Sequence, residues 1–197
     1  MTQPAFSLTR GNSAVARLTM WELGMQVIDC DIPPGSALGR DLIENAYFHD
    51  SYFAPLARPE LGIVDIYTAI LGHTPLTLKL LLIARNAIVR PFGLKAPTAA
   101  EIMRSGFRTG HAVGDTIGRW RIFFISEDEI IAGADDKHQD FRVSVLRARH
   151  LETAGVVMTT ICTVHNLFGK LYLFFVVPFH RYAVRKLLSN AVAAKRL

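Results

Sequence analysis

The sequence lacks most of the features by which catalytic and secreted proteins are recognised. Only two of its 197 residues are cysteines, Cys30 and Cys162, and their spacing fits neither a CxxC motif nor a Cys/His ligand set. There is no GxSxG, P-loop, GxGxxG or HExxH motif, so hydrolase, kinase and dehydrogenase activities gain no support. The first residues also lack the charged-then-apolar order of a signal peptide. We therefore expect a cytoplasmic protein without a metal ion or other cofactor.

Long apolar runs are also missing. The two longest, residues 171–179 and 80–84, are well under the roughly 18 residues that indicate a membrane-spanning helix. An integral membrane protein is therefore not expected, whereas peripheral contact with a membrane stays open.

Acidic residues are absent from the last part of the chain. Lys and Arg number 22 against 17 Asp and Glu, a formal net charge of +5. The surplus lies in residues 166–197, which hold six cations and no acid. A solvated helix face explains this, and weak contact with an anionic membrane surface is the alternative. Nucleic-acid binding is not expected, because no zinc-finger, RRM or KH pattern accompanies the charge.

What the sequence does contain is enough apolar material for one domain. Half of the residues are apolar, 20% are charged and the mean hydropathy is +0.25. A folded chain of this length hides roughly 70% of its unfolded surface, so it has a sizeable core. We expect a single domain over residues 1–197, in which residues 1–40 show no clear pattern and residues 41–197 form the ordered unit.

Helical periodicity follows an early strand. Residues 46–54 alternate aromatic and polar side chains, which predicts a strand. Apolar spacing then predicts helices over Ile63–Leu71 and Leu76–Val89. Thr98 and Glu101 form a capping box for a short helix that ends at Gly106.

From residue 118 the period changes to two. Three strands, over residues 129–134, 140–149 and 156–165, follow a first strand and are joined by short turns, which predicts an antiparallel meander. In the first strand one side is expected to carry Trp120, Ile122 and Phe124, and the other Phe123 and Ile125.

A long helix closes the chain, from its N-cap Asn166 to about Ala194, with Pro178 as an expected kink. Residues 171–179 are apolar all round, so we expect burial on most sides. One face carries spaced apolar residues and one histidine: Leu173, Val177, His180, Val184, Leu187 and Ala191. The opposite side carries a basic stripe: Lys170, Arg181, Arg185, Ser189 and Arg196. The predicted class is α+β, with a curved antiparallel sheet wrapped around this helix.

Two stretches of the sequence look familiar. GADDKHQDFRVSV (133–145) and HNLFGKLY (165–172), with PFH at 178–180, are accompanied by RPFGLK (90–95) and FHDSY (48–52). Together they resemble the bacterial domain-of-unknown-function family 2867, over about residues 40–194. The resemblance implies a START-like or Bet v 1-like (SRPBCC) helix-grip fold, with a ligand cavity between sheet and helix. It implies no reaction, because fold does not determine function.

Four polar residues alternate near the expected turn at 134–137. If Asp136, His138, Asp140 and Arg142 lie on an extended segment, their side chains share one face. A polar hairpin with internal pairs, a contact to a bound ligand and a metal site are the three interpretations, of which the first is the commonest in proteins.

The end of the last strand and the helix add further candidates. His165 sits next to the helix cap, and His180 interrupts the inward apolar face, where a neutral imidazole needs a hydrogen bond. The aromatic residues around sheet and helix are expected to be mostly core, with some lining a pocket: Trp120, Phe123, Phe124, Phe141, Tyr172, Phe174 and Phe175.

Three functions remain open. The leading hypothesis is binding of an apolar or amphipathic small molecule, with Trp120, Arg142, His165, Tyr172 and His180 as ligand contacts. The second is a cyclase- or isomerase-like enzyme that moves protons with His138 or His180 and Asp136 or Asp140. The third is a peripheral membrane or regulatory partner that uses the basic stripe. A homodimer is also open.

Overall fold

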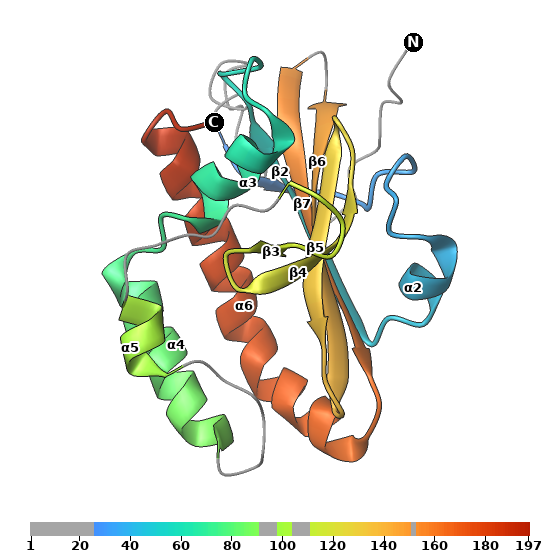
Figure 1. Cartoon of the computed structure of the whole chain (residues 1–197), viewed down its shortest axis with the longest axis vertical. Helices are drawn as coiled ribbons and strands as arrows, with labels where there is room; N and C mark the ends of the chain where they lie inside the picture. The colour runs from blue at the N-terminus through green and yellow to red at the C-terminus, as the bar shows by residue number, and fades with distance from the viewer. Residues whose placement is uncertain (1–25, 91–97, 104–110, 151–152) are drawn as a thin grey trace, which may run out of the picture.

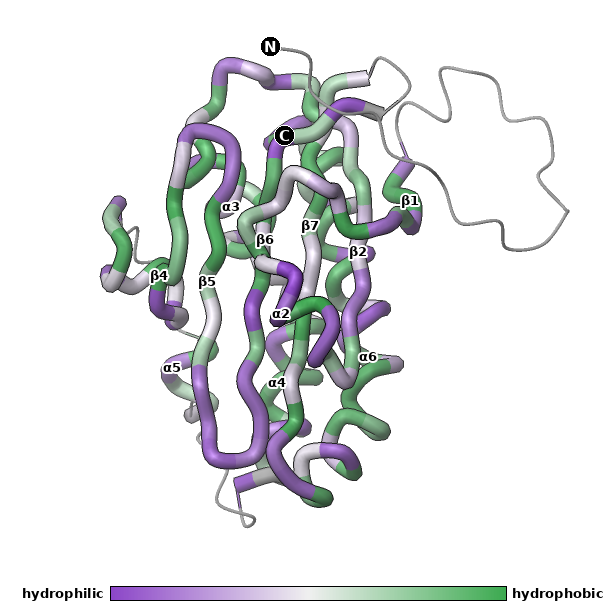
Figure 2. Tube along the Cα trace, turned by 90° about the vertical axis from the view of Figure 1, so that its right-hand side faces the viewer, coloured by the Kyte–Doolittle hydropathy of each residue, from purple (hydrophilic) through white to green (hydrophobic). Residues whose placement is uncertain are grey.

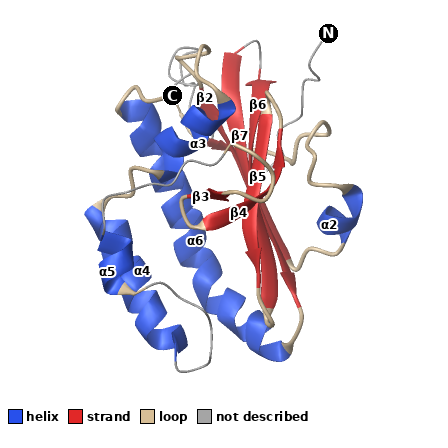
Figure 3. Cartoon of the chain, in the orientation of Figure 1, coloured by secondary structure: helices blue, strands red, loops and turns tan. Residues whose placement is uncertain are grey.

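A seven-stranded antiparallel sheet carries the fold (Figures 1 and 3). The structure, a computed structural model, describes residues 26–90, 98–103, 111–150 and 153–197. Neighbouring strands follow the order β1-β2-β7-β6-β5-β4-β3. The strands are β1 (Ile28–Asp29), β2 (Phe48–Pro55), β3 (Thr116–Ile117), β4 (Trp120–Ile125), β5 (Glu129–Asp135), β6 (Gln139–His150) and β7 (Thr153–Val164).

Most of the helical residues gather on one side of this curved sheet (Figure 1). The helices are α2 (Arg40–Glu44), α3 (Ile63–Leu71), α4 (Leu76–Val89), α5 (Ala99–Met103) and α6 (Leu167–Ala193). We call the face toward α3 and α6 the inner face, and the face covered by residues 30–47, which include α2, the outer face.

The main core lies between the inner face and the helices. Ile66, Tyr67 and Ile70 of α3 are fully buried in it, and Leu188 of α6 joins them. Burying side chains of this size contributes about 1.5–3 kcal/mol each, so α3 is held by packing on the sheet and on α6. A second inner cluster surrounds Leu173 at the other end of α6.

Most predicted elements are confirmed. The bounds of α3 and α4 coincide with the predicted helices, and β5, β6 and β7 start and end within a few residues of the predicted strands. The capping box is present, since Glu101 N donates to Thr98 Oγ1 over 3.3 Å and Thr98 N donates to Glu101 Oε2 over 2.7 Å. The predicted end of that helix, Gly106, lies outside the described residues.

The prediction that residues 171–179 are buried on most sides is wrong. α6 runs through Pro178 as one helix, and its sheet-facing side is buried as expected at Tyr172 and Leu173. Its outward side is exposed, with Phe174 and Phe175 at 72% and 61%. An all-round apolar helix predicts burial only when a neighbour covers each side, and here the outward side is open.

The alternation predicted for β4 is confirmed at Phe123, which packs on the outer face, but it is wrong from Phe124 onward. A β-bulge shifts the register between Ile122 and Phe124, so that Ile122 pairs with Ala132 and Phe124 with Ile131. An extra residue in one strand reverses the side to which later side chains point. Phe124 therefore faces outward and is 36% exposed.

A buried carboxylate fixes the outer layer to the sheet. Glu129 at the start of β5 is 2% exposed and accepts hydrogen bonds from Ser36 Oγ (2.6 Å), Ala37 N (2.6 Å) and Ser144 Oγ (2.5 Å). A buried carboxylate requires such donors, because its desolvation is costly. Three donors on one side chain thus connect residues 36–37 to β5 and β6.

One helix pair meets the length and apolarity expected of a membrane span, but only in combination. Among the described residues no single helix meets both criteria. The pair Ile63–Leu71 and Leu76–Ala87 does so together, although it is bent by 77° at the break.

Replacing Glu129 by Gln should destabilise the fold. The NH₂ group of the new amide would face the hydroxyl and N–H groups that now donate to the carboxylate, and at least one of these hydrogen bonds would be lost. We expect the free energy of unfolding to fall by about 1–3 kcal/mol. Urea denaturation of E129Q measures this loss. The exposed neighbour E127Q is the control, and an equal effect of the two changes would contradict the role assigned to Glu129.

Replacing Gly133 by Ala should also destabilise the protein. An added Cβ at Gly133 would overlap the backbone carbonyl oxygen of Phe141 on the paired strand β6, which cannot move independently. We expect a loss of about 1–3 kcal/mol. G35A, where a Cβ meets nothing within 4 Å, should leave the urea midpoint almost unchanged.

Candidate functional site

The inner face of the sheet carries a shielded carboxylate, Asp50, opposite the middle of α6. Asp50 lies on the same side of β2 as Tyr52, because residues two apart on a strand point to the same face. Its Oδ1 lies 3.3 Å from Nε2 of His180 on α6, and its Oδ2 accepts a 3.2 Å hydrogen bond from the Tyr52 hydroxyl. The side chains of Asp50 and His180 are 9% and 24% exposed, so the pair is largely removed from water.

Two neighbouring groups stay protonated beside this carboxylate. Burial, followed by the charge of Asp50, raises the pKa of Tyr52 to about 12. The same two causes raise the pKa of Cys162, on the adjacent strand β7, to about 12. At neutral pH the Tyr52 hydroxyl is therefore a hydrogen-bond donor to Asp50, and the Cys162 thiol is uncharged and unreactive.

A third polar residue, Thr160, lies opposite Asp50 in the register of β2 and β7. It is 3% exposed, and its Oγ1 has no hydrogen-bond partner among the described residues. An unpaired buried hydroxyl carries a desolvation cost that its surroundings do not repay. Thr160 is therefore a group on the inner face that a further hydrogen-bonding partner would satisfy.

The three polar residues separate two apolar clusters. On β7, Thr160 lies between Met158 of the main core and Cys162 of the second cluster. On α6, His180 lies between Leu173 of the second cluster and Val184 of the main core. On β2, Asp50 lies between Phe48 of the second cluster and Tyr52 of the main core. The sequence thus places a polar belt across the inner face, on three elements at one level.

Aromatic side chains border the polar belt at the edge of the sheet. The Phe48 and His180 rings meet edge to face at 5.7 Å between centroids. The guanidinium of Arg181 lies 5.5 Å from the centre of the Phe48 ring, and that of Arg185 lies 5.2 Å from the Tyr52 ring. Arg185 also pairs with Asp29 of β1. These contacts tie α6 to β1 and β2.

A second group of side chains lies toward α4. The Trp120 and Phe141 rings meet edge to face at 5.3 Å, and Phe141 packs against both apolar clusters. On α6, the buried Tyr172 has the guanidinium of Arg85, from α4, 4.9 Å above its ring. Trp120 and Tyr172, both predicted ligand contacts, thus lie on the helix-covered side of the sheet together with His180.

Arg85 is a half-buried cation without a carboxylate partner among the described residues. Its Nη1 donates to Oδ1 of Asn86 over 2.8 Å, and its guanidinium lies over the Tyr172 ring. Burial, and secondly the nearby charge of Arg119, lower the pKa of Arg85 to about 10. Arg119 occupies the tight turn between β3 and β4, where its charge acts on Arg85 and the charge of Glu101, on α5, acts on Arg119.

The structure does not place Asp136, His138, Asp140 and Arg142 on one extended face. β5 ends at Asp135 and β6 begins at Gln139, so Asp136 and His138 belong to the turn. His138 Nδ1 contacts the Asn166 side-chain amide at 3.1–3.2 Å, and Asp140 Oδ1 accepts from Asp136 N over 3.2 Å. The polar hairpin with internal pairs, one of the three interpretations, describes this geometry.

The remaining predicted contacts, Arg142 and His165, lie on the outer face. Arg142 pairs with Asp135 at 2.6 Å and covers the Phe123 ring at 3.6 Å. His165 Nε2 lies 3.0 Å from Asp140 Oδ2. The structure therefore does not bring these residues together with His180. In the part of the chain that is described, no three His, Cys, Asp or Glu side chains could hold a metal ion together.

The sequence matches a known family over most of its length. A family model described as a protein of unknown function, DUF2867, matches residues 42–187. The chain belongs to this family. No curated protein matches the sequence, and no solved structure matches it either.

Within this DUF2867 chain, two of the stretches that carry the family resemblance fix the start of α6 and supply polar residues on the inner face. HNLFGKLY begins α6, where Asn166 Oδ1 accepts from Gly169 N over 3.0 Å, as the predicted cap requires. Gly169 lets α6 approach the His138 carbonyl, which an added Cβ would contact. FHDSY supplies Asp50 and Tyr52 of the polar belt.

Sequence reasoning missed Asp50, Thr160 and Arg85. A signal for Asp50 was present, because alternation puts it on one face with Phe48, Tyr52 and Ala54, where an acid is unexpected. Thr160 and Arg85 gave no comparable signal, since their polar surroundings come from distant parts of the chain.

Both cysteines of this DUF2867 chain should resist thiol reagents while the protein is folded. Burial raises the pKa of the Cys30 and Cys162 thiols to about 12, so little thiolate forms at pH 8. A DTNB assay should give almost no reaction with native protein and two thiols after denaturation in guanidinium. Rapid modification of the native protein would contradict this environment.

Proposed function

We propose that this chain binds an amphipathic small molecule between the inner face of its sheet and α6. In this proposal the sheet and α6 form a helix-grip arrangement of the START-like type. The ligand lies along the inner face, with its apolar part against the two clusters and its polar groups on the belt.

The observation that supports this proposal is the polar belt of Asp50, Thr160 and His180. Apolar side chains at these positions would extend the contact between the two clusters, which both pack against Phe141, and would avoid the cost of burying polar groups. Asp50 instead faces His180, and Thr160 Oγ1 has no described partner. A few convergent polar groups in an apolar wall are the usual composition of a small-molecule site.

Arg85 favours a ligand with an anionic end. Its guanidinium is held over Tyr172 and oriented by Asn86, but no described carboxylate neutralises it. A carboxylate or phosphate would add charge-assisted hydrogen bonds at this position. Tyr172, which lies under Arg85, and His180, in the polar belt, are eight residues apart on α6, or about 12 Å along its axis. A ligand that contacts both Arg85 and the polar belt therefore has at least that length.

The second candidate, proton-transfer catalysis, is supported by the His180–Asp50 contact alone. The other acids considered for it, Asp136 and Asp140, pair within the hairpin turn and with His165. A general acid or base must lie within hydrogen-bond reach of the proton it moves. We therefore put binding first.

Ligand screening tests the proposal directly. Saturated fatty acids and aromatic carboxylates are added to the full chain and followed by thermal shift and native mass spectrometry. A ligand at about 100 times its Kd stabilises a protein by about 2.7 kcal/mol, which gives a clear rise in Tm. Absence of binding across this panel by both methods would refute the proposal.

Two substitutions locate the site. R85Q should weaken binding of a carboxylate roughly tenfold or more, because a charge-assisted hydrogen bond is lost. R90Q, on an exposed arginine at the end of α4, is the matched control and should bind as the wild type does. D50N preserves the size of the side chain but removes the charge of the polar belt, so it should change the affinity for a ligand whose polar groups lie on the belt. Unchanged affinity in both R85Q and D50N would place the ligand elsewhere.

A further inference from the structure

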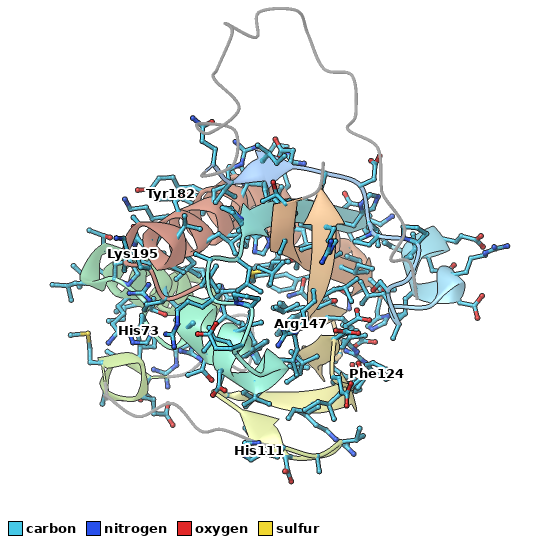
Figure 4. The ribbon with its side chains drawn as sticks, turned by 90° about the horizontal axis from the view of Figure 1, so that it is seen from above. His73, His111, Phe124, Arg147, Tyr182 and Lys195 are labelled. Carbon is cyan, nitrogen blue, oxygen red and sulfur yellow. The ribbon has the colours of Figure 1, made fainter. Side chains whose placement is uncertain are left out.

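The outward side of α6 is an apolar stripe, which we define by its large exposed residues. Their exposed fractions lie between 55% and 79%. They are Leu167, Leu171, Phe174, Phe175, Phe179 and Tyr182. Spacings of three and four residues put them on one side of the helix, opposite the buried side. Figure 2 shows the hydrophobic colour continuing along this half of α6, and Figure 4 shows Tyr182 turned away from the sheet.

An exposed stripe of this kind requires an explanation. Isolated surface leucines are normal, but contiguous large apolar patches are rare on monomeric proteins and mark interaction surfaces. The stripe extends over four turns of one helix and contains three phenylalanines. The buried side of the same turns is already satisfied by the sheet, through Tyr172 and Leu173. The packing of the described fold therefore does not account for the apolar residues of the stripe.

Positive charge lies along one border and at one end of the stripe. Lys170 and Arg181 lie along one border of it, Lys186 lies beyond its end, and all three are exposed. Residues 166–197 contain no acid that could neutralise them on this helix. Apolar and aromatic residues on one side of a helix with cations beside them are the composition of helices that lie in the surface of anionic membranes.

We propose that α6 lies flat on an anionic lipid bilayer, with the stripe inserted among the head groups and the cations beside lipid phosphates and carboxylates. Each Lys or Arg near such a surface adds electrostatic attraction to the lipids, and the aromatic rings add apolar burial. A second copy of this chain fits the stripe less well. In a two-fold contact the same cations of both copies would meet, without an acid on either helix to compensate.

Vesicle flotation of the full chain tests this proposal. The probes are vesicles of phosphatidylcholine alone and of phosphatidylcholine mixed with phosphatidylserine. We expect the protein to float with the mixed vesicles, to float less with the neutral ones, and to lose binding as salt is raised. Failure to float with mixed vesicles at low salt would overturn the proposal.

A double variant with a control on the outer face distinguishes vesicle binding by the stripe from nonspecific binding by any exposed aromatic ring. F174S/F175S changes two exposed rings and should weaken vesicle partitioning roughly tenfold or more without lowering Tm. F124S removes an exposed ring from the outer face, beyond the sheet from α6, and should float as the wild type does (Figure 4). Equal flotation of the wild type and F174S/F175S would overturn the proposal.

Sedimentation velocity examines the competing occupant. A dimer that F174S/F175S converts to a monomer, in a protein that does not bind vesicles, would assign the stripe to a second copy and overturn the membrane proposal. A monomer that floats would support it. The outcome does not depend on the small-molecule site, because Phe174 and Phe175 lie on the side of α6 away from the polar belt.

Discussion

The packing of α6 across the inner face is the interaction on which the rest of the structure depends. This helix closes both apolar clusters, through Val184 and Leu188 at one end and Leu173 at the other. Its start is fixed by the Asn166 cap and by the close approach of Gly169 to the β5–β6 turn. Without this contact, Asp50 would lose His180 and the inner face would be open to water.

The two sides of α6 are both apolar, but one packs on the sheet and the other is exposed. Toward the sheet, apolar side chains interlock and leave one level where polar groups from three elements meet. Away from the sheet, equally apolar side chains are uncovered and are bordered by cations. A binder of amphipathic molecules that also rests on a lipid surface would take up its ligand where such molecules are concentrated, since their apolar parts partition into bilayers.

Much of the fold could be predicted from the sequence, because periodicity reports which side of an element is apolar. The helices Ile63–Leu71 and Leu76–Val89 follow directly from it, and so do the long strands. Periodicity does not report whether a neighbour covers the apolar side. It therefore failed for the outward side of α6, and it failed from Phe124 onward, where the bulge shifts the register. The short elements β1, β3 and α2 contain too few residues to show a period.

The candidate site was less predictable than the fold. The sequence singles out His180, Trp120 and Tyr172 because they interrupt or enrich elements with a clear inward face, and the structure places all three on that face. Their partners Asp50 and Arg85 come from β2 and α4, and only the tertiary arrangement brings them near α6. Conversely, Arg142 and His165 were predicted as ligand contacts together with His180. The pleat of β6 directs Arg142 to the outer face, where it pairs with Asp135, and His165 pairs with Asp140 just beyond the end of β7.

The sheet ends on both sides in a very short strand. β1 and β3 each contain two residues, and each pairs with a longer neighbour over those residues alone. An outermost strand offers unpaired backbone groups to other polypeptides, and a long flat one invites strand addition and fibril growth. Strands this short offer little backbone template. In the described part of the chain, the two outermost strands are therefore short, while the exposed apolar side chains lie on α6.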